Sequence, residues 1–462
     1  MMMLFSLIAF VLLSGFALIY CGGARNCASG ALVKKQALSI LPVIFILSNL
    51  LYVVPVSMQV VIYDDIHQAR NLDVQSYIGY FPFALLLNIV FILSFSLFYR
   101  ATIATFRLRL SFSAEVQSLP RLIFWSTLLL FSVICAYMVM QLSGKVGGVA
   151  NFILLGYSVT EQFNSGGIAV VGLPWLVTIS LLYLTDAKAN GSLSRQIIGV
   201  CFLALVMASF VIMGRRGALV GVGIALLTIY HFQYKELSVK SVIMLVFVGF
   251  VSMNVIGLIR GSSYDNFSGA VNSLNNQIDN VASDGNLDIF YTLTKGNFVT
   301  PFQSLPNIIA QAGEDIDFQW GGAALKGVSL LVPESIWSER PEPLSNWYMR
   351  KFVDSSAADN EGVQFYFLSG AYLDFGVFGP LLWGSIYGIG FAAIGIWFAR
   401  RLHSPVHIAL FGLFVGNMLN FIAAESVAGI IVFAKSAAAP CILILLLTAL
   451  VRGRSGNGTK YA

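Results

Sequence analysis

Continuous apolar runs recur along this chain and constrain its fold more than any other feature. Eleven of them are long enough, at roughly twenty residues, to cross about 30 Å of hydrocarbon. They lie near residues 3–21, 37–62, 79–99, 121–142, 166–184, 196–213, 217–233, 239–259, 376–399, 407–424 and 427–450. A membrane β-barrel would instead show alternating segments of about ten residues. The runs therefore predict membrane-spanning α-helices.

Composition agrees with this prediction and argues against other classes of protein. Charged residues make up 11% of the 462 residues and hydrophobic residues 57%. A soluble domain carries roughly 25% charged residues and could not bury this much apolar surface. The chain has no charge blocks or polar tracts, which argues against disorder and against nucleic acid as a partner. We therefore predict an all-α polytopic membrane protein with membrane lipid around it.

The loop charges predict how the chain is oriented in the membrane. Arginine and lysine gather in alternate loops and in the C-terminal tail, as in the loops that hold Arg100 and Arg107 or Arg400 and Arg401. By the positive-inside rule these loops are cytoplasmic. The N-terminus is then expected outside and the C-terminus inside.

One hydrophilic segment is too long to be a simple connection. Residues 260–362 hold 13 of the chain's 22 acidic residues and are expected on the outer side. A segment this long in a compact chain usually has a function or a fold of its own. We predict eight spans in residues 1–259, an external lid over residues 260–362, and three spans with a short tail in residues 363–462.

Four arginines are expected at or above the outer membrane surface. Arg215 and Arg216 form an outer turn with Gly214 and Gly217, against the usual charge bias. Arg260 closes the eighth apolar segment and Arg340 lies late in the external loop. Guanidinium groups pair bidentately with phosphate oxygens, and a helix N-terminus also favours an anion. These residues predict a diphosphate site; arginines that only reach toward lipid headgroups are the alternative.

Further polar residues lie between or within the last two apolar segments. Glu425 follows Asn417 and Asn420, which share one side of a helix. Glu425 is interpreted as an acid that orients an arginine or takes a proton from a hydroxyl, with a solvated helix-end acid as the alternative. Lys435 lies deeper in the last segment. Its role, in an internal pair or in the anion site, is left open.

Aromatic side chains gather in or just after the long loop. Trp337 and Tyr348 are the candidates for contact with sugar rings, although anchoring at the membrane interface explains such residues equally well. Asp374 is expected to be structural and to cap the start of the ninth segment. The spacing of histidine and cysteine gives no metal motif, so no metal and no cofactor is predicted.

In residues 205–440 the chain resembles the Wzy-type polymerases that join oligosaccharide repeat units into O-antigen and other bacterial surface polysaccharides. The motifs that carry this resemblance are Gly214-Arg215-Arg216, Arg260, the stretch Pro333–Pro341, the glycine-bearing return to the membrane at Gly370–Gly379, and the pair Asn417 and Glu425. Some members of that family carry an arginine just before the acid. Ala424 stands there in this chain, which leaves the partner of Glu425 open.

The resemblance implies a GT-C-like glycosyltransferase of the bacterial inner membrane, with a periplasmic N-terminus and a cytoplasmic C-terminus. Such enzymes move a growing chain from undecaprenyl diphosphate onto a new lipid-linked unit. The donor and acceptor are both partners, and a chain-length regulator protein is a further candidate partner. Two alternatives are an O-antigen ligase, which is expected to use a loop histidine, and a lipid-linked oligosaccharide transporter. Residues 261–362 contain no histidine.

Overall fold

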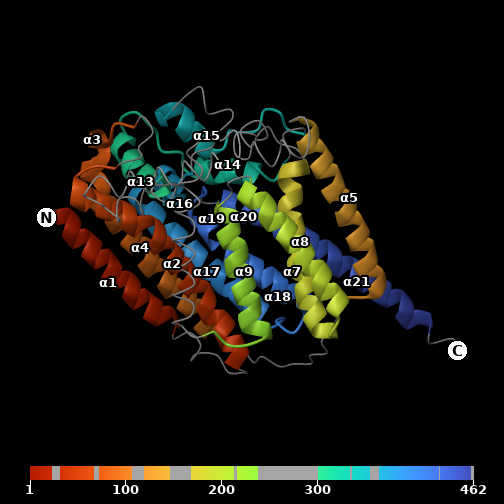
Figure 1. Cartoon of the computed structure of the whole chain (residues 1–462). Coiled ribbons are helices and arrows are strands. Elements are labelled where there is room, and N and C mark those ends of the chain that lie inside the picture. The colour runs from red at the N-terminus through yellow and green to blue at the C-terminus, as the bar shows by residue number, and fades with distance from the viewer. Residues whose placement is uncertain are drawn as a thin grey trace, which may run out of the picture. The chain divides into compact units, whose positions relative to one another are not determined.

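The computed structural model describes residues 1–22, 32–66, 72–106, 119–145, 168–212, 216–237, 300–332, 336–353, 364–425 and 427–458 (Figure 1). In this part of the chain every regular element is a helix, and the β pairing is one isolated bridge between Ala312 and Ile316. The prediction of an all-α protein is confirmed for these residues. A chain in lipid must satisfy its backbone hydrogen bonds within each segment, and a helix does so.

Six helical stretches are long and apolar enough to cross a membrane. They are Met2–Gly22, Gln36–Tyr63, Val74–Thr105, Leu193–Val211, Phe367–Ala399 and Ala428–Val451. The protein is therefore a multi-pass α-helical membrane protein.

Helices also occupy four of the other five segments that the sequence marks as spans. They are α5 (Arg121–Lys145), α7 (Ile168–Asn190), α9 (Arg216–Gln233) and α18 (Pro405–Gly416). The predicted span 239–259 lies outside the described residues. The count of eleven spans, and with it the exact domain limits, stays a prediction.

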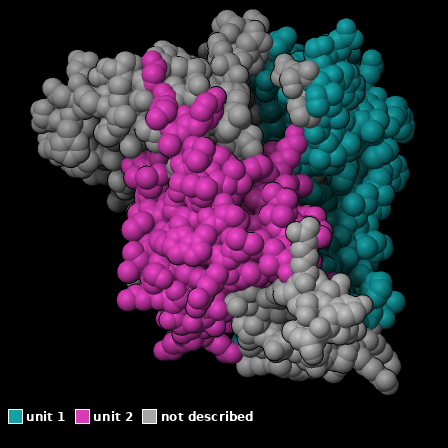
Figure 2. Space-filling model, turned by 90° about the vertical axis from the view of Figure 1, so that its right-hand side faces the viewer, with its two compact units in different colours: residues 1–112, 288–400, 417–431 teal, residues 113–287, 401–416, 432–462 magenta. Residues whose placement is uncertain are grey.

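The chain forms two compact units, coloured separately in Figure 2. Unit 1 contains residues 1–112, 288–400 and 417–431; unit 2 contains residues 113–287, 401–416 and 432–462.

Unit 1 is built around close contact between two helices. Its spans are α1 (Met2–Gly22), α2 (Leu32–Tyr63), α3 (Val74–Tyr77) with α4 (Phe81–Thr105), and α16 (Phe367–Phe375) with α17 (Gly379–Ala399). A Cβ on Gly384 would lie 2.7 Å from the Phe91 carbonyl oxygen, and one on Gly388 would lie 2.5 Å from that of Phe95. Glycines thus let α17 and α4 approach closely, as small residues do between membrane helices.

Part of the predicted external loop folds onto one end of the spans of unit 1. It forms α13 (Thr300–Gln311), α14 (Gly322–Ser329), α15 (Leu344–Tyr348) and a π-helical turn, Met349–Val353. Helix α13 packs against α2, α3, α4 and α16. Because α13 contacts α3, it lies where α2 ends and α4 begins, and Figure 1 shows α13 beside α3.

Unit 2 contains α5, α7, α8 (Leu193–Ile212), α9, α18 and α21 (Ala439–Gly458). Helices α9 and α18 run antiparallel, because Gly221 near the start of α9 meets Gly416 at the end of α18. A Cβ on Gly416 would lie 2.2 Å from the Gly221 carbonyl oxygen, so this contact requires glycine. The packing places the first residue of α9, Arg216, at the end of unit 2 where α18 stops.

The segment predicted as one span over 407–424 is not one continuous helix. Helix α18 ends at Gly416, and α19 (Met418–Ile422) begins after Asn417. The chain passes from unit 2 to unit 1 at this point. The following segment starts with α20 (Ala428–Phe433), widens into a π-helical turn over Ala434–Ala438, and continues as α21.

Candidate functional site

The arginine pair at the start of α9 is only partly described. Arg216 is the first residue of this helix, and its backbone position is fixed by the α9–α18 packing. Arg215 and Arg260 lie outside the described residues, and nothing is described of the Arg216 side chain. The first turn of a helix presents free backbone N–H groups, so the position suits an anion.

Glu425 lies in the interior of unit 1 and holds the loop to the membrane helices. Its side chain is only 3% exposed. Oε1 accepts a hydrogen bond from the Ser345 backbone N–H at 3.1 Å and a longer one from the Ser345 hydroxyl at 3.5 Å. Ser345 is in the first turn of α15, so the carboxylate caps that helix across 80 residues of sequence. The alternative of a solvated helix-end acid is therefore wrong.

Burial also changes the acid–base chemistry of this carboxyl group. Removal from water raises the pKa of Glu425 above its ordinary value, and the N–H groups of Ser345 and Leu344 and the charge of Lys326 act in the opposite direction. Among the described residues, no group donates a hydrogen bond to Oε2. One carboxylate oxygen therefore binds the loop, and the other is buried in unit 1.

Replacing Glu425 with glutamine should make stability less dependent on pH. The raised pKa means that the stabilising contribution of the protonated acid is complete below its ordinary pKa of 4.5 and is lost as pH rises through the raised value. We expect the thermal midpoint of the wild type to fall relative to that of Glu425→Gln as pH rises above 4.5. Thermal unfolding of both proteins in the same detergent measures this. A difference that stays constant with pH would contradict it.

The two predicted asparagines lie together at the break between α18 and α19. The side-chain amide of Asn420 donates to Oδ1 of Asn417 at 3.0 Å, and Asn420 is exposed. Asn417 is the residue that precedes α19. The pair thus offers polar atoms at an interruption between two apolar helices, and its contact with a substrate stays a prediction.

Arg340 is held in a turn after α14. Its backbone N–H donates to the Trp337 carbonyl at 3.2 Å, and its guanidinium Nη1 donates to the Val332 carbonyl at 3.3 Å. Trp337 is 41% exposed. Nearby, Arg350 pairs with Glu342 at 3.0 Å, with 52% of the arginine side chain exposed. Arg340 is therefore positioned by backbone contacts, whereas Arg350 takes part in a surface ion pair.

Tyr348 lies in the core of the folded loop. It is completely buried, and its hydroxyl accepts a hydrogen bond from the Asn307 side chain at 2.9 Å. Its ring packs on Phe352 and Phe365. This position gives Tyr348 a packing role, and the predicted contact with sugar has no exposed surface through which to act.

Lys435 is in the π-helical turn of unit 2. Such turns disturb the regular helix hydrogen bonding and are frequent at functional sites. Two side chains of α7 bond to the widened backbone: the Trp175 indole donates to the Lys435 carbonyl at 3.0 Å, and the Thr178 hydroxyl donates to the Ser436 carbonyl at 3.1 Å. Lys435 itself is half-buried. Both interpretations of its ammonium group remain open.

Asp374 is structural, but it caps a different helix from the one expected. It is fully buried at the end of α16, and its carboxylate accepts backbone hydrogen bonds from Gly321, Ala323 and Ala324 at 3.0, 2.8 and 3.1 Å. These N–H groups belong to the start of α14. Asp374 therefore fixes the start of α14 to the end of α16, and it does not cap α17, the helix that follows it in the sequence.

The sequence analysis missed a buried polar network in unit 1. The Asn49 amide donates to Asn88 at 2.8 Å, and the Asn88 amide donates to the Tyr366 hydroxyl at 2.7 Å. The Tyr366 N–H donates to the Ser304 hydroxyl of α13 at 3.0 Å. A single asparagine within each of two apolar segments was the available signal, because polar residues in spans usually have partners.

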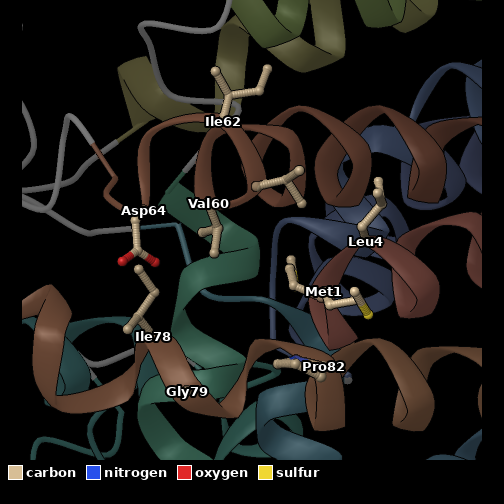
Figure 3. Close-up of a pocket in the computed structure, with 10 residues that line it drawn as sticks. Met1, Leu4, Val60, Ile62, Asp64, Ile78, Gly79 and Pro82 are labelled. Atoms are coloured by element: carbon tan, nitrogen blue, oxygen red, sulfur yellow. The ribbon is translucent and has the colours of Figure 1, made fainter.

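A hollow in unit 1 contains none of the predicted site residues. It has a volume of about 360 Å³ and is mainly apolar, with lining residues Met1, Met3, Leu4, Val60, Val61, Ile62, Asp64, Ile78, Gly79 and Pro82. Figure 3 shows the Asp64 carboxylate beside Ile78 at its edge. One carboxylate in an apolar hollow is a poor match for a diphosphate.

Comparison with known proteins gives no match to a family model, to a curated protein or to a solved structure. The proposed function is therefore based on the sequence motifs and on the described residues of the site.

Proposed function

We propose that this chain is a Wzy-type polymerase of undecaprenyl-diphosphate-linked oligosaccharide repeat units, acting at the periplasmic face of the bacterial inner membrane. The observation that supports this most is the attachment of α13–α15 to one end of the spans of unit 1. There the buried Glu425 carboxylate contacts the first turn of α15. A folded layer over the ends of membrane helices suits a substrate with a lipid tail and a sugar head.

The proposed reaction exchanges one glycosidic bond for another. The bond between the growing chain and its diphosphate carrier breaks, and the carrier leaves as an anion. An acceptor hydroxyl loses its proton and forms the new bond to the chain. Arg216, Arg260 and Arg340 stabilise the charge that develops on the diphosphate. Glu425 is the proposed base, because a raised carboxyl pKa lies closer to the pH at which proton transfer must work.

The proposed orientation follows from the loop charges. The N-terminus is periplasmic and the C-terminus cytoplasmic, with eleven spans in a GT-C-like arrangement. This places Arg216, Arg340 and Glu425 on one side of the membrane. Donor and acceptor both reach that side as lipid-linked oligosaccharides, and a chain-length regulator is a further candidate partner.

Deleting the gene and separating surface polysaccharide by gel electrophoresis tests the function. Loss of long chains, with single repeat units still attached to their final acceptor, is the expected result. Loss of all sugar from the acceptor would indicate the ligase alternative. Accumulation of repeat units on the cytoplasmic side would indicate the transporter alternative.

Replacing Arg340 with alanine should eliminate chain extension at unchanged protein level. Arg340 is held by the Val332 and Trp337 carbonyls in a turn followed by Pro341, which restricts its backbone. Its guanidinium is thus held at a fixed place in the folded loop. Gel analysis of polysaccharide, with immunoblotting of the protein, measures the effect. Arg350→Ala is the matched control and should leave polymer near normal, because this arginine forms an exposed ion pair. Normal polymer in Arg340→Ala would remove Arg340 from the site.

A further inference from the structure

Helix α14 has an apolar face that is exposed and that no described residue is shown to cover. Leu325, Val328 and Leu331 are 68%, 42% and 51% exposed, and the three-residue spacing puts them on one side of the helix and its final turn. Ala323 and Gly327, on the opposite side, are buried. Large apolar side chains exposed in this way mark a surface for another molecule or for a membrane.

An exposed tryptophan lies close to α14 in the sequence. Trp320 lies two residues before the start of α14 and is 78% exposed. It has a left-handed backbone with a φ of 48°, a conformation that non-glycine residues rarely adopt. Its N–H nevertheless donates to the Asp374 carbonyl at 3.1 Å. The fold therefore maintains this backbone with the indole directed out of the protein.

Two contacts fix α14, one at the end of α16 and one just before α20. The Asp374 carboxylate binds the first N–H groups of α14, and α17 begins five residues later at Gly379. At the other side, a Cβ on Gly327 would lie 3.0 Å from the Val427 side chain, immediately before α20. Helix α14 is thus held beside the junction of α16 and α17 and beside the start of α20.

Side chains at the start of α17 and in α20 are also apolar and exposed. Phe378, Leu381 and Leu382 are 69%, 48% and 42% exposed at the start of α17, and Ile430 of α20 is 38% exposed. In a multi-pass membrane protein, exposed apolar side chains on spans face lipid. We propose that residues 320–331 form an interfacial segment, whose apolar face inserts into the bilayer at the boundary between headgroups and acyl chains.

The residue types of the segment 320–331 fit insertion into the boundary of a bilayer. Interfacial helices combine an apolar face with a polar or basic one, and tryptophan is enriched at this depth. Lys326 supplies the basic group on α14, and its ammonium lies 5.7 Å from the centre of the Trp347 ring, on the protein side. The inference rests on the membrane spans and the docking of α14. It holds whether or not the protein is a polymerase.

Spin labels on the full-length protein in lipid nanodiscs test the proposal. All five native cysteines are replaced, and a label is attached in turn at Leu325, Val328 and Leu331, with exposed Asp315 as the control. The three α14 labels should collide readily with oxygen and poorly with a water-soluble nickel chelate, and the Asp315 label should show the reverse. Chelate access at α14 equal to that at Asp315 would overturn the proposal. Protection from both reagents would also overturn it, by showing that protein covers the face.

Tryptophan fluorescence gives a test that keeps the native cysteines. In nanodiscs with brominated phosphatidylcholine, Trp320→Phe should reduce the quenched share of the emission. Trp347→Phe is the matched control, because this ring is half-buried beside Lys326 within the protein. The control should leave quenching of the remaining emission undiminished. Equal quenching of the wild type and Trp320→Phe would place the indole outside the bilayer.

Discussion

Replacing Arg216 with alanine is expected to abolish long polysaccharide chains while leaving the protein in the membrane at its normal level. Arg216 opens α9, where backbone N–H groups and the positive helix end already favour an anion. Removing one donor of this kind typically lowers a reaction rate by about 10²–10³-fold. Gel analysis of polysaccharide from cells that carry only the variant measures the result.

A lysine at the same position separates charge from geometry. Arg216→Lys keeps the positive charge but loses the planar fork that binds two phosphate oxygens, so we expect partial recovery of chain length. Arg260→Ala should abolish long chains as Arg216→Ala does, because both arginines are proposed to bind the same diphosphate. Normal chains in both alanine variants would rule out a diphosphate site at these arginines.

Replacing Asp374 with alanine is expected to give the largest loss of stability. The variant removes the acceptor of three backbone N–H groups at the start of α14. One of these hydrogen bonds is buried and two are part-buried. Each buried donor left unsatisfied costs roughly 1–3 kcal/mol, and we expect a total of about 3 kcal/mol because water can reach the part-buried ones. Thermal unfolding in detergent, followed by size-exclusion fluorescence, measures the loss.

Two further variants give this prediction its controls. Asp374→Asn keeps one acceptor oxygen and should fall between the wild type and alanine. Asp315→Ala removes an exposed acid of the same loop and should change the midpoint little. If Asp374→Ala unfolds at the wild-type temperature, the three hydrogen bonds contribute little to the docking of α14.

The helical spans could be predicted from sequence because a long apolar run in a bilayer must satisfy its backbone hydrogen bonds internally, and an α-helix does so. Two departures from regular helix could not, because each depends on a neighbour distant in sequence. The break after Gly416 occurs where α18 meets Gly221 of α9. The π-helical turn at Lys435 is stabilised by Trp175 and Thr178 of α7. Hydropathy is a property of one segment and contains no information about such partners.

The candidate site shows the same limit. The sequence predicts Glu425 at a helix end, and the structure finds it between α19 and α20. Its burial under α15 was not predictable, because α15 lies 80 residues earlier and docks through tertiary packing. Tyr348 was chosen for its aromatic ring, but the fold of the loop encloses that ring. Residue type indicates chemistry, whereas accessibility is decided by the fold.

The Asn49–Asn88–Tyr366 network determines how three helices are rotated about their own axes. Apolar side chains are nearly interchangeable against lipid tails, so hydrophobicity alone leaves the rotation of a span weakly specified. The side-chain amides of Asn49 on α2 and Asn88 on α4 restrict this rotation. Turning either helix would expose an unpaired amide to hydrocarbon, where no water can replace the lost hydrogen-bond partner. The hydroxyl of Tyr366 donates to Asn88 and so limits the rotation of α16 at its start in the same way.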